Sequence, residues 1–131
     1  MIELAILFRA LNLYAHFAHN MTKGLTFFQD HAFFGELYET ADDFYDQLIE
    51  RIIGTSNETI SLSEIDSKAN ALISKGNDNY YGTIKAVLEK SLSDIEKLCR
   101  YGKFSVGTLN LLQGQADQIE VILYKIKQKM K

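Results

Sequence analysis

Histidine and carboxylate side chains, both ligands for transition metals, gather in the first fifty residues of the chain. Three histidines, His16, His19 and His31, lie in its first quarter. Asp46 and Glu50 follow four residues apart, so they project from one face of a helix. Imidazole and carboxylate together suit iron or zinc better than calcium or magnesium. The pattern predicts a metal site with His19, His31, Asp46 and Glu50 as ligands and His16 as a candidate accessory ligand.

The spacing of these residues decides how they can meet. Fifteen residues separate His31 from Asp46, which is about 22 Å along a helix at about 1.5 Å per residue. One chain therefore cannot hold a single metal ion with both. A common site needs a second copy of the helix, antiparallel and related by a two-fold axis, which generates two equivalent sites. The assumption of a common site thus predicts a homodimer.

Two alternatives to this site stay open. The four candidate ligands are also compatible with polar residues on a helix surface, and His16 with a surface or interface histidine. The Glu-x-x-His signature of intrachain di-iron bundles does not occur in the sequence. A ferritin or ribonucleotide-reductase type of centre is therefore not expected.

The elements that must position these residues are helical. Apolar residues recur at spacings of three and four almost throughout, and proline is absent. Four long helices and a short one are expected: Glu3 to about Asn20, Thr26 to Gly54, the short Ser61 to about Ser74, one that carries Tyr81 and stops at Gly102, and Ser105 to about Met130. Short loops make the first two and the last two long helices antiparallel hairpins, and the middle connection crosses between them.

Several helix ends have local signals. Thr26 with Gln29, and Ser61 with Glu64, have the spacing of capping boxes. Ser105 is a predicted N-cap, and Gly54 is expected to end the second helix in the left-handed conformation. Lys75 to Asn79 is expected to form a turn. The predicted core stripes run along single helix faces and include Phe17 in the first helix, Met130 in the last, and, in the second, Phe34, Leu37, Tyr38, Ala41, Tyr45, Leu48 and Ile52.

Composition sets the outer bounds of the prediction. A chain of 131 residues fits one domain, residues 1–131, and 47 % apolar residues can form a core. The net charge of −3 gives no overall attraction to nucleic acid. The lone Cys99 is expected to be a small apolar residue on a helix, with no internal disulfide. The N-terminal apolar run is interrupted by polar residues, so we expect a soluble, cytoplasmic protein with no membrane segment.

The stretch from His19 to Ile53 resembles the Dps family, ferritin-like mini-cages that protect DNA in stressed bacteria. The family's core looks like His-Trp-x-x-Lys-Gly-x-x-Phe-Phe-x-x-His, then Phe, Leu-Tyr and Asp-x-x-x-Glu-Arg. The matching segments here are His19-Asn20-Met21-Thr22-Lys23-Gly24-Leu25-Thr26-Phe27-Phe28-Gln29-Asp30-His31, Phe34, Leu37-Tyr38 and Asp46-Gln47-Leu48-Ile49-Glu50-Arg51. The spacings of 12, 15 and 4 between the four candidate ligands match the family without a gap.

The resemblance implies a fold, an assembly and an activity. The fold would be all-α, a ferritin-like four-helix bundle with a short helix in the crossover between the second and third long helices. The assembly would be a dodecamer built from two-fold dimers. The activity would be a ferroxidase: non-haem iron, held by His19, His31, Asp46 and Glu50, is oxidised by hydrogen peroxide or oxygen and stored as ferric mineral, with DNA protection as a further role.

Two residues depart from the family's pattern. Asn20 replaces the family's tryptophan, and Gly35 stands where the family often has a further carboxylate. Glu36 does not replace that carboxylate, because it points about 100° away on a helix. The loss predicts a weaker site, or one that holds a single ion. It also supports an alternative function: a degenerate oligomeric scaffold, or a DNA-shielding protein, without a working iron site.

The C-terminal segment is the candidate for DNA contact. Four alternating lysines, Lys125, Lys127, Lys129 and Lys131, lie in its last seven residues. Basic tails bind DNA by neutralising phosphates. Lysines in the last turn of a helix also complement the helix dipole, and that alternative is the stronger one here.

Overall fold

The computed structural model describes residues 1–74 and 79–131, and in these residues the chain is helical with no strand. The five helices are α1 (Ile2–Met21), α2 (Phe27–Thr55), α3 (Leu62–Ile73), α4 (Tyr80–Tyr101) and α5 (Val106–Lys129). The all-α prediction is confirmed for this part of the chain. Of the turn predicted at Lys75 to Asn79, all but Asn79 lies outside the described residues.

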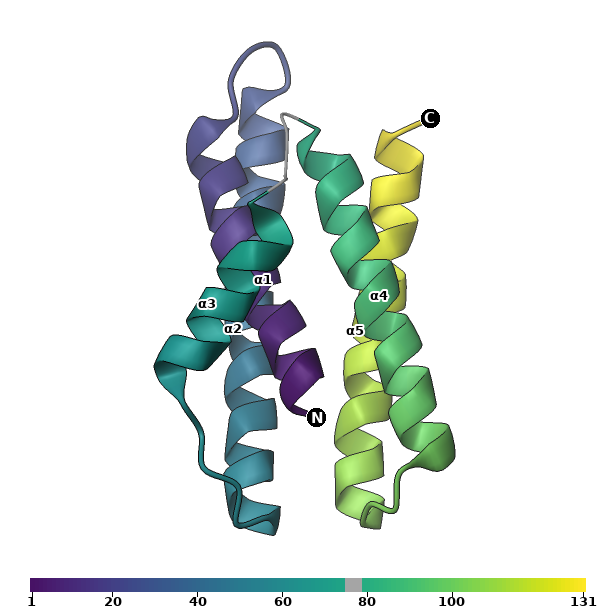
Figure 1. Cartoon of the computed structure of the whole chain (residues 1–131). Helices are drawn as coiled ribbons and strands as arrows, with labels where there is room; N and C mark the ends of the chain where they lie inside the picture. The colour runs from purple at the N-terminus through teal and green to yellow at the C-terminus, as the bar shows by residue number, and fades with distance from the viewer. Residues whose placement is uncertain (75–78) are drawn as a thin grey trace.

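The four long helices run side by side along the length of the molecule, and α3 crosses the outside of α1 (Figure 1). Helices α1 and α2 form one antiparallel hairpin, and α4 and α5 form another. Helix α1 packs against α2, α3 and α4, while α4 packs against α5. The loop lengths predicted this arrangement, because short turns leave no room for any other pairing.

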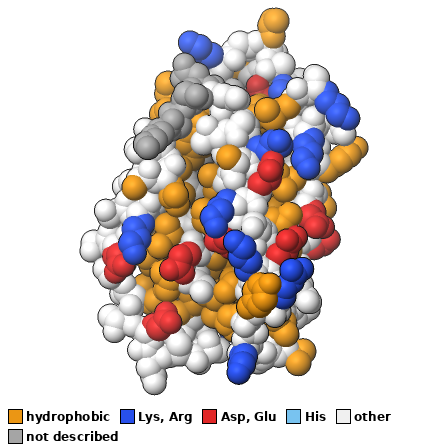
Figure 2. Space-filling model, turned by 45° about the vertical axis from the view of Figure 1, so that its right-hand side comes forward, with side chains coloured by type: hydrophobic (Ala, Val, Ile, Leu, Met, Phe, Trp, Pro, Cys, Tyr) orange, Lys and Arg blue, Asp and Glu red, His pale blue; other side chains and the backbone are white. Residues whose placement is uncertain are grey.

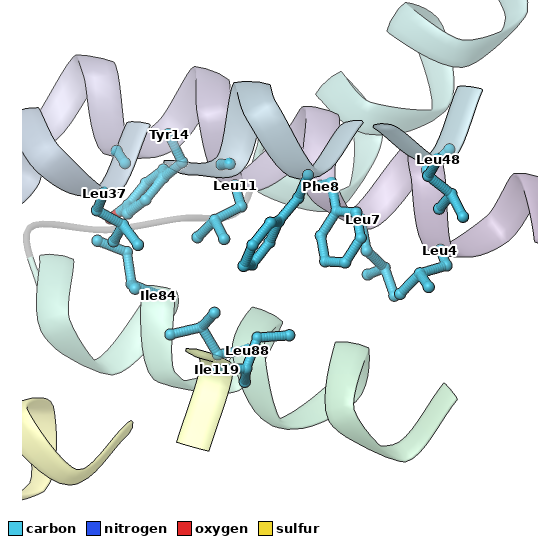
Figure 3. Packing of buried hydrophobic residues seen from close by; sticks show 14 of the residues in the cluster. Leu4, Leu7, Phe8, Leu11, Tyr14, Leu37, Leu48, Ile84, Leu88 and Ile119 are labelled. Carbon is cyan, nitrogen blue, oxygen red and sulfur yellow. The ribbon is translucent and has the colours of Figure 1, made fainter. Parts of the chain in front are cut away.

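The core lies between the two hairpins, where α1, α2, α4 and α5 all contribute apolar side chains (Figure 3). Phe8 and Phe44 pack at its centre, with ring centroids 5.2 Å apart. Full burial of each such side chain stabilises the fold by about 1.5–3 kcal/mol. A smaller cluster joins α3 to α1 through Ile65 and Ala69. One main core therefore joins the four long helices, and the smaller cluster attaches α3 to α1.

The apolar stripe of α2 follows the predicted face with one shift. Its buried residues are Phe34, Leu37, Ala41, Phe44, Leu48 and Ile52. Tyr38 and Tyr45 were expected in this stripe but are only half-buried, and Phe44 takes the central position instead. Phe17 and Met130 were also placed on core stripes, yet both are about half exposed, 49 % and 48 %. Both lie near the end of a helix, at the rim of the core.

Three predictions about helix ends are confirmed. The hydroxyl of Ser105 accepts a hydrogen bond from the Thr108 N–H at the start of α5. Ser61 accepts one from the Glu64 N–H at the start of α3. Helix α4 ends before Gly102.

Two predictions about helix ends are wrong. Thr26 makes no cap hydrogen bond, because its hydroxyl donates to the Asp30 carboxylate at 2.6 Å instead. Gly54 does not end α2 in a left-handed conformation, since the helix continues through Thr55. Among the described residues the positive-φ glycine is Gly24, with φ of 94°.

The face shown in Figure 2 mixes cationic and anionic side chains over an apolar background. Charges also pair along α4, where Lys90 lies 2.6 Å from Asp94 and Lys85 lies 3.2 Å from Glu89. This face therefore presents no field of one sign. In residues 1–74 and 79–131, no helix is long and apolar enough to cross a membrane.

Candidate metal centre

The turn between α1 and α2 brings two histidines together. His19 lies in the last turn of α1, and His31 near the start of α2. Between them the chain reverses at Gly24, whose φ of 94° is accessible to glycine at low cost. This reversal brings the two imidazoles into contact.

The imidazoles of His19 and His31 are stacked and joined by crossed hydrogen bonds. Their ring centroids lie 3.7 Å apart and the ring planes are 20° from parallel. Nδ1 of His19 is 2.7 Å from the carbonyl oxygen of His31, and Nδ1 of His31 is 2.9 Å from the carbonyl oxygen of His19. A carbonyl oxygen only accepts, so each Nδ1 carries the proton and donates it. In the neutral form of either ring, the lone pair is then on Nε2.

This arrangement is the one a metal-binding histidine needs. A histidine ligand almost always donates its other ring N–H to a carbonyl or carboxylate, which fixes its tautomer and orientation. Here both rings are oriented in this way by the backbone itself. The backbone thus fixes the orientation of both imidazoles, as it does for many metal-binding histidines.

Aromatic rings surround the histidine pair. Phe27 stacks on His31, with centroids 4.9 Å apart, and Tyr38 meets His19 edge-on at 5.4 Å. His16 stacks on Tyr38 at 4.2 Å, and its centroid is 6.3 Å from that of His19. The structure thus places His16 beside Tyr38, one ring away from the pair. Its role as an accessory ligand stays a prediction.

Gly35 faces the ring of His19. A Cβ atom at this position would lie 3.1 Å from both Cε1 and Nδ1 of His19, which is tighter than ordinary van der Waals contact. The space that a carboxylate side chain would need at position 35 is therefore occupied by the imidazole. The lack of a side chain at Gly35, which departs from the Dps pattern, thus allows the His19 ring to pack in its present position.

The two candidate carboxylate ligands lie elsewhere on the chain. Asp46 and Glu50 are both exposed on the second half of α2, away from the turn that carries the histidines. In the described ranges, 1–74 and 79–131, no group of three or more His, Cys, Asp or Glu side chains is placed to hold a metal ion. The structure therefore brings His19 and His31 together. Asp46 and Glu50 lie far from this histidine pair within the chain, as the helix spacing required.

The sequence did not predict the buried carboxylate of Asp30, which lies next to the candidate site. Asp30 is 9 % exposed and accepts hydrogen bonds from the hydroxyls of Thr26 at 2.6 Å and Tyr81 at 2.5 Å. Lys129 lies 3.3 Å from the same carboxylate. The available signal was local: an acidic residue in the first turn of a helix. Tyr81 and Lys129 lie 51 and 99 residues away in the sequence, so no local signal indicated that they contact Asp30.

The environment of Asp30 shifts two pKa values. Burial alone would raise the pKa of Asp30, but the hydrogen bonds from Thr26 and Tyr81 and the charge of Lys129 outweigh it and hold that pKa below its usual value. Burial and the hydrogen bond to Asp30 raise the pKa of Tyr81. Asp30 is therefore ionised near neutral pH, and Lys129 is engaged with it.

The remaining candidate residues are the C-terminal lysines and Cys99. Lys125, Lys127 and Lys131 are exposed, whereas Lys129 forms an ion pair with Asp30. Cys99 is half-buried against the core, as expected, and burial raises the pKa of its thiol.

Comparison of the chain with protein-family models, with curated proteins and with solved structures finds no match. The crossed hydrogen bonds of His19 and His31 are therefore the main structural indication of function.

Proposed function

We propose that this protein is a Dps-like ferroxidase, a cytoplasmic ferritin-like four-helix bundle that oxidises Fe(II) with hydrogen peroxide or oxygen and stores the product. One observation supports it above the others: His19 and His31 both donate Nδ1–H to a backbone carbonyl. In its neutral form each ring would then offer the lone pair of its Nε2 to a metal ion. Iron is the substrate here, bound by the protein and converted.

The other half of the site comes from a second copy of the chain. Asp46 of the partner subunit and Glu50 of the partner subunit would approach the histidine pair across a two-fold axis. Carboxylates stabilise Fe(III) more than Fe(II), because they add negative charge, and oxygen ligands favour the harder ion. The histidines are only half-buried, which leaves room for the oxidant to reach the ion.

The proposed assembly is a dodecamer of chains, built from such dimers, which encloses the ferric product. DNA protection is a secondary part of the proposal, supported by Lys125, Lys127 and Lys131, which are exposed at the C-terminal end of α5. Twelve copies of a weak contact would add up to useful affinity.

The first test is oxidation of Fe(II) by the purified protein, followed by absorbance with substoichiometric hydrogen peroxide against a protein-free control. The wild-type protein is expected to oxidise iron rapidly and keep the product soluble. His31→Ala and Asp46→Asn are each expected to lose this activity. Glu120→Gln, which removes an exposed carboxylate of α5, is the matched control and should behave like the wild type.

Mixing the two inactive variants tests whether the site is shared. In a dimer of one His31→Ala chain and one Asp46→Asn chain, one site carries both defects and the other carries neither. Co-refolded mixtures are therefore expected to regain activity that neither variant has alone. Failure of this rescue, with both variants assembled, would contradict a site between subunits.

The alternative function is an oligomeric scaffold or DNA-shielding protein without a working iron site. Gly35 favours it, because the space for a further ligand is taken by the His19 ring. Oxidation no faster than in the protein-free control would support this alternative and contradict the ferroxidase.

A further inference from the structure

One end of the bundle, which carries the α1–α2 turn and the C-terminus, has exposed apolar side chains beside exposed lysines. We propose that this end binds the surface of an anionic lipid bilayer, with Leu25 and Phe28 inserted among the headgroups. This inference goes beyond the proposed function and does not depend on iron chemistry.

Three large apolar side chains at the α1–α2 turn face solvent. Leu25 is fully exposed, and Phe28 and Met21 are 82 % and 51 % exposed. The chain reverses at Gly24, with φ of 94°, immediately before Leu25. Single exposed apolar residues are common on protein surfaces, but three within eight residues of one turn indicate a contact surface. We call Met21, Leu25 and Phe28 the apolar tip.

Lysines from two segments lie at the same end of the bundle. Lys23 is exposed in the α1–α2 turn, and Lys127 and Lys131 are exposed at the end of α5. The turn and the C-terminus lie at the same end of the molecule (Figure 1). The ion pair of Lys129 with Asp30, at 3.3 Å, joins the end of α5 to the start of α2. The apolar tip therefore has cationic side chains at its own end of the bundle.

The charge of this end is opposite in sign to that of the chain. Residues 17–31 and 124–131 contain five lysines and one acidic residue, Asp30, whereas the whole chain has a net charge of −3. Asp30 is buried, and Lys129 compensates its charge. An anionic bilayer attracts lysines near its surface and accepts apolar side chains at the boundary between headgroups and acyl chains.

The combination of apolar and cationic side chains distinguishes a bilayer from two other partners. DNA would attract the lysines, but its phosphates offer no apolar surface to Leu25 and Phe28. A tip-to-tip contact between two copies of the chain would cover the apolar tip, but it would also bring like-charged lysines together. An anionic bilayer accommodates both kinds of side chain.

Tryptophan fluorescence can test the insertion directly. The chain contains no tryptophan, so Leu25→Trp places a single fluorophore at the apolar tip. Its emission is recorded with vesicles of phosphatidylserine and phosphatidylcholine, and with vesicles of phosphatidylcholine alone. Val106→Trp is the matched control, because Val106 is 85 % exposed at the start of α5, at the opposite end of the bundle (Figure 1). Only Leu25→Trp, and only with the anionic vesicles, is expected to shift its emission to the blue.

Co-sedimentation with the same anionic vesicles measures how strongly the full chain binds. The double variant Leu25→Ser, Phe28→Ser should bind at least about ten-fold more weakly than the wild type, because it loses apolar burial. The double variant Lys127→Ala, Lys131→Ala should bind about 20-fold more weakly, since each lysine near an anionic surface contributes about five-fold. Lys103→Ala, at an exposed lysine between α4 and α5, is the control and should bind like the wild type.

Three results would overturn the proposal. The first is a wild-type protein that does not sediment with anionic vesicles, or sediments equally with the neutral ones. The second is binding that the serine variant leaves unchanged, which would mean adsorption by charge alone. The third is the loss of a homo-oligomer in the serine variant without vesicle binding by the wild type, which would assign the apolar tip to a contact between copies. Retardation of DNA that depends on Lys127 and Lys131, again without vesicle binding, would assign these lysines to nucleic acid and also overturn the proposal.

Discussion

Replacement of Gly35 by alanine tests the packing between α2 and the His19 ring. In the interior of a helix, alanine is more favourable than glycine by about 1 kcal/mol. At position 35 the new Cβ would lie 3.1 Å from two atoms of the His19 ring. The ring must therefore move by a few tenths of an ångström, although its Nδ1 is held at 2.7 Å from the His31 carbonyl.

Gly114 is the matched control for this substitution. It lies in α5, and a Cβ there would meet no atom within 4 Å. Gly114→Ala should therefore gain the full increment of about 1 kcal/mol in the free energy of unfolding. In Gly35→Ala, weakening a hydrogen bond worth about 0.5–1.5 kcal/mol offsets that gain. We expect the two variants to differ by about 1 kcal/mol, which is about a five-fold change in the unfolding equilibrium.

The assay is urea denaturation at equal protein concentration, because subunit association would add to the apparent stability. Iron oxidation is measured on the same samples. A displaced ligand-orienting contact typically costs 10–100-fold in metal affinity or activity, so Gly35→Ala should need more Fe(II) to saturate, and Gly114→Ala should not. Equal stabilisation of both variants with unchanged oxidation would refute the contact between position 35 and His19.

Three further predictions concern the Asp30 cluster and the C-terminal lysines. Tyr81→Phe removes a hydrogen bond to a charged group and should lower the free energy of unfolding by about 1.5–3 kcal/mol in urea titrations. Because the pKa of Asp30 is lowered by folding, its stabilisation is present above the unfolded value of about 3.9 and is lost as pH falls through the lower folded value. Acid titrations should therefore show less loss of stability in Asp30→Asn than in the wild type, and parallel curves would contradict this assignment. If the tail binds DNA, the triple alanine variant of Lys125, Lys127 and Lys131 should abolish salt-sensitive gel retardation without affecting folding; full retardation by that variant would refute the DNA contact.

The helices could be predicted from the sequence because their signals are local. The apolar repeat, the absence of proline and the breaks at Gly24 and Gly102 together located every described helix to within a few residues. Caps were less predictable where another side chain of the same turn competes. Thr26 has the sequence context of an N-cap, but the nearby carboxylate of Asp30 accepts its hydroxyl proton instead.

The candidate site could be predicted only in outline. Histidine and carboxylate types, and their spacing, indicated both the chemistry and the need for a second chain. The crossed hydrogen bonds of His19 and His31 could not be foreseen, because they depend on how the turn at Gly24 aligns the two helix ends. The environment of Tyr38 could not be predicted either, because the rings of His16 and His19 beside it come from another helix.

The Asp30 cluster also sets how far one hairpin can slide along the other. Apolar packing has no direction, so a core of leucine, isoleucine and phenylalanine tolerates small axial shifts at little cost. Hydrogen bonds are directional and do not tolerate such shifts. The carboxylate of Asp30 in α2 accepts a hydrogen bond from Tyr81 in α4 and forms an ion pair with Lys129 in α5. The register of the two hairpins is thus defined at a single turn. His31 is the next residue along the chain, so this reference point coincides with the candidate metal ligands.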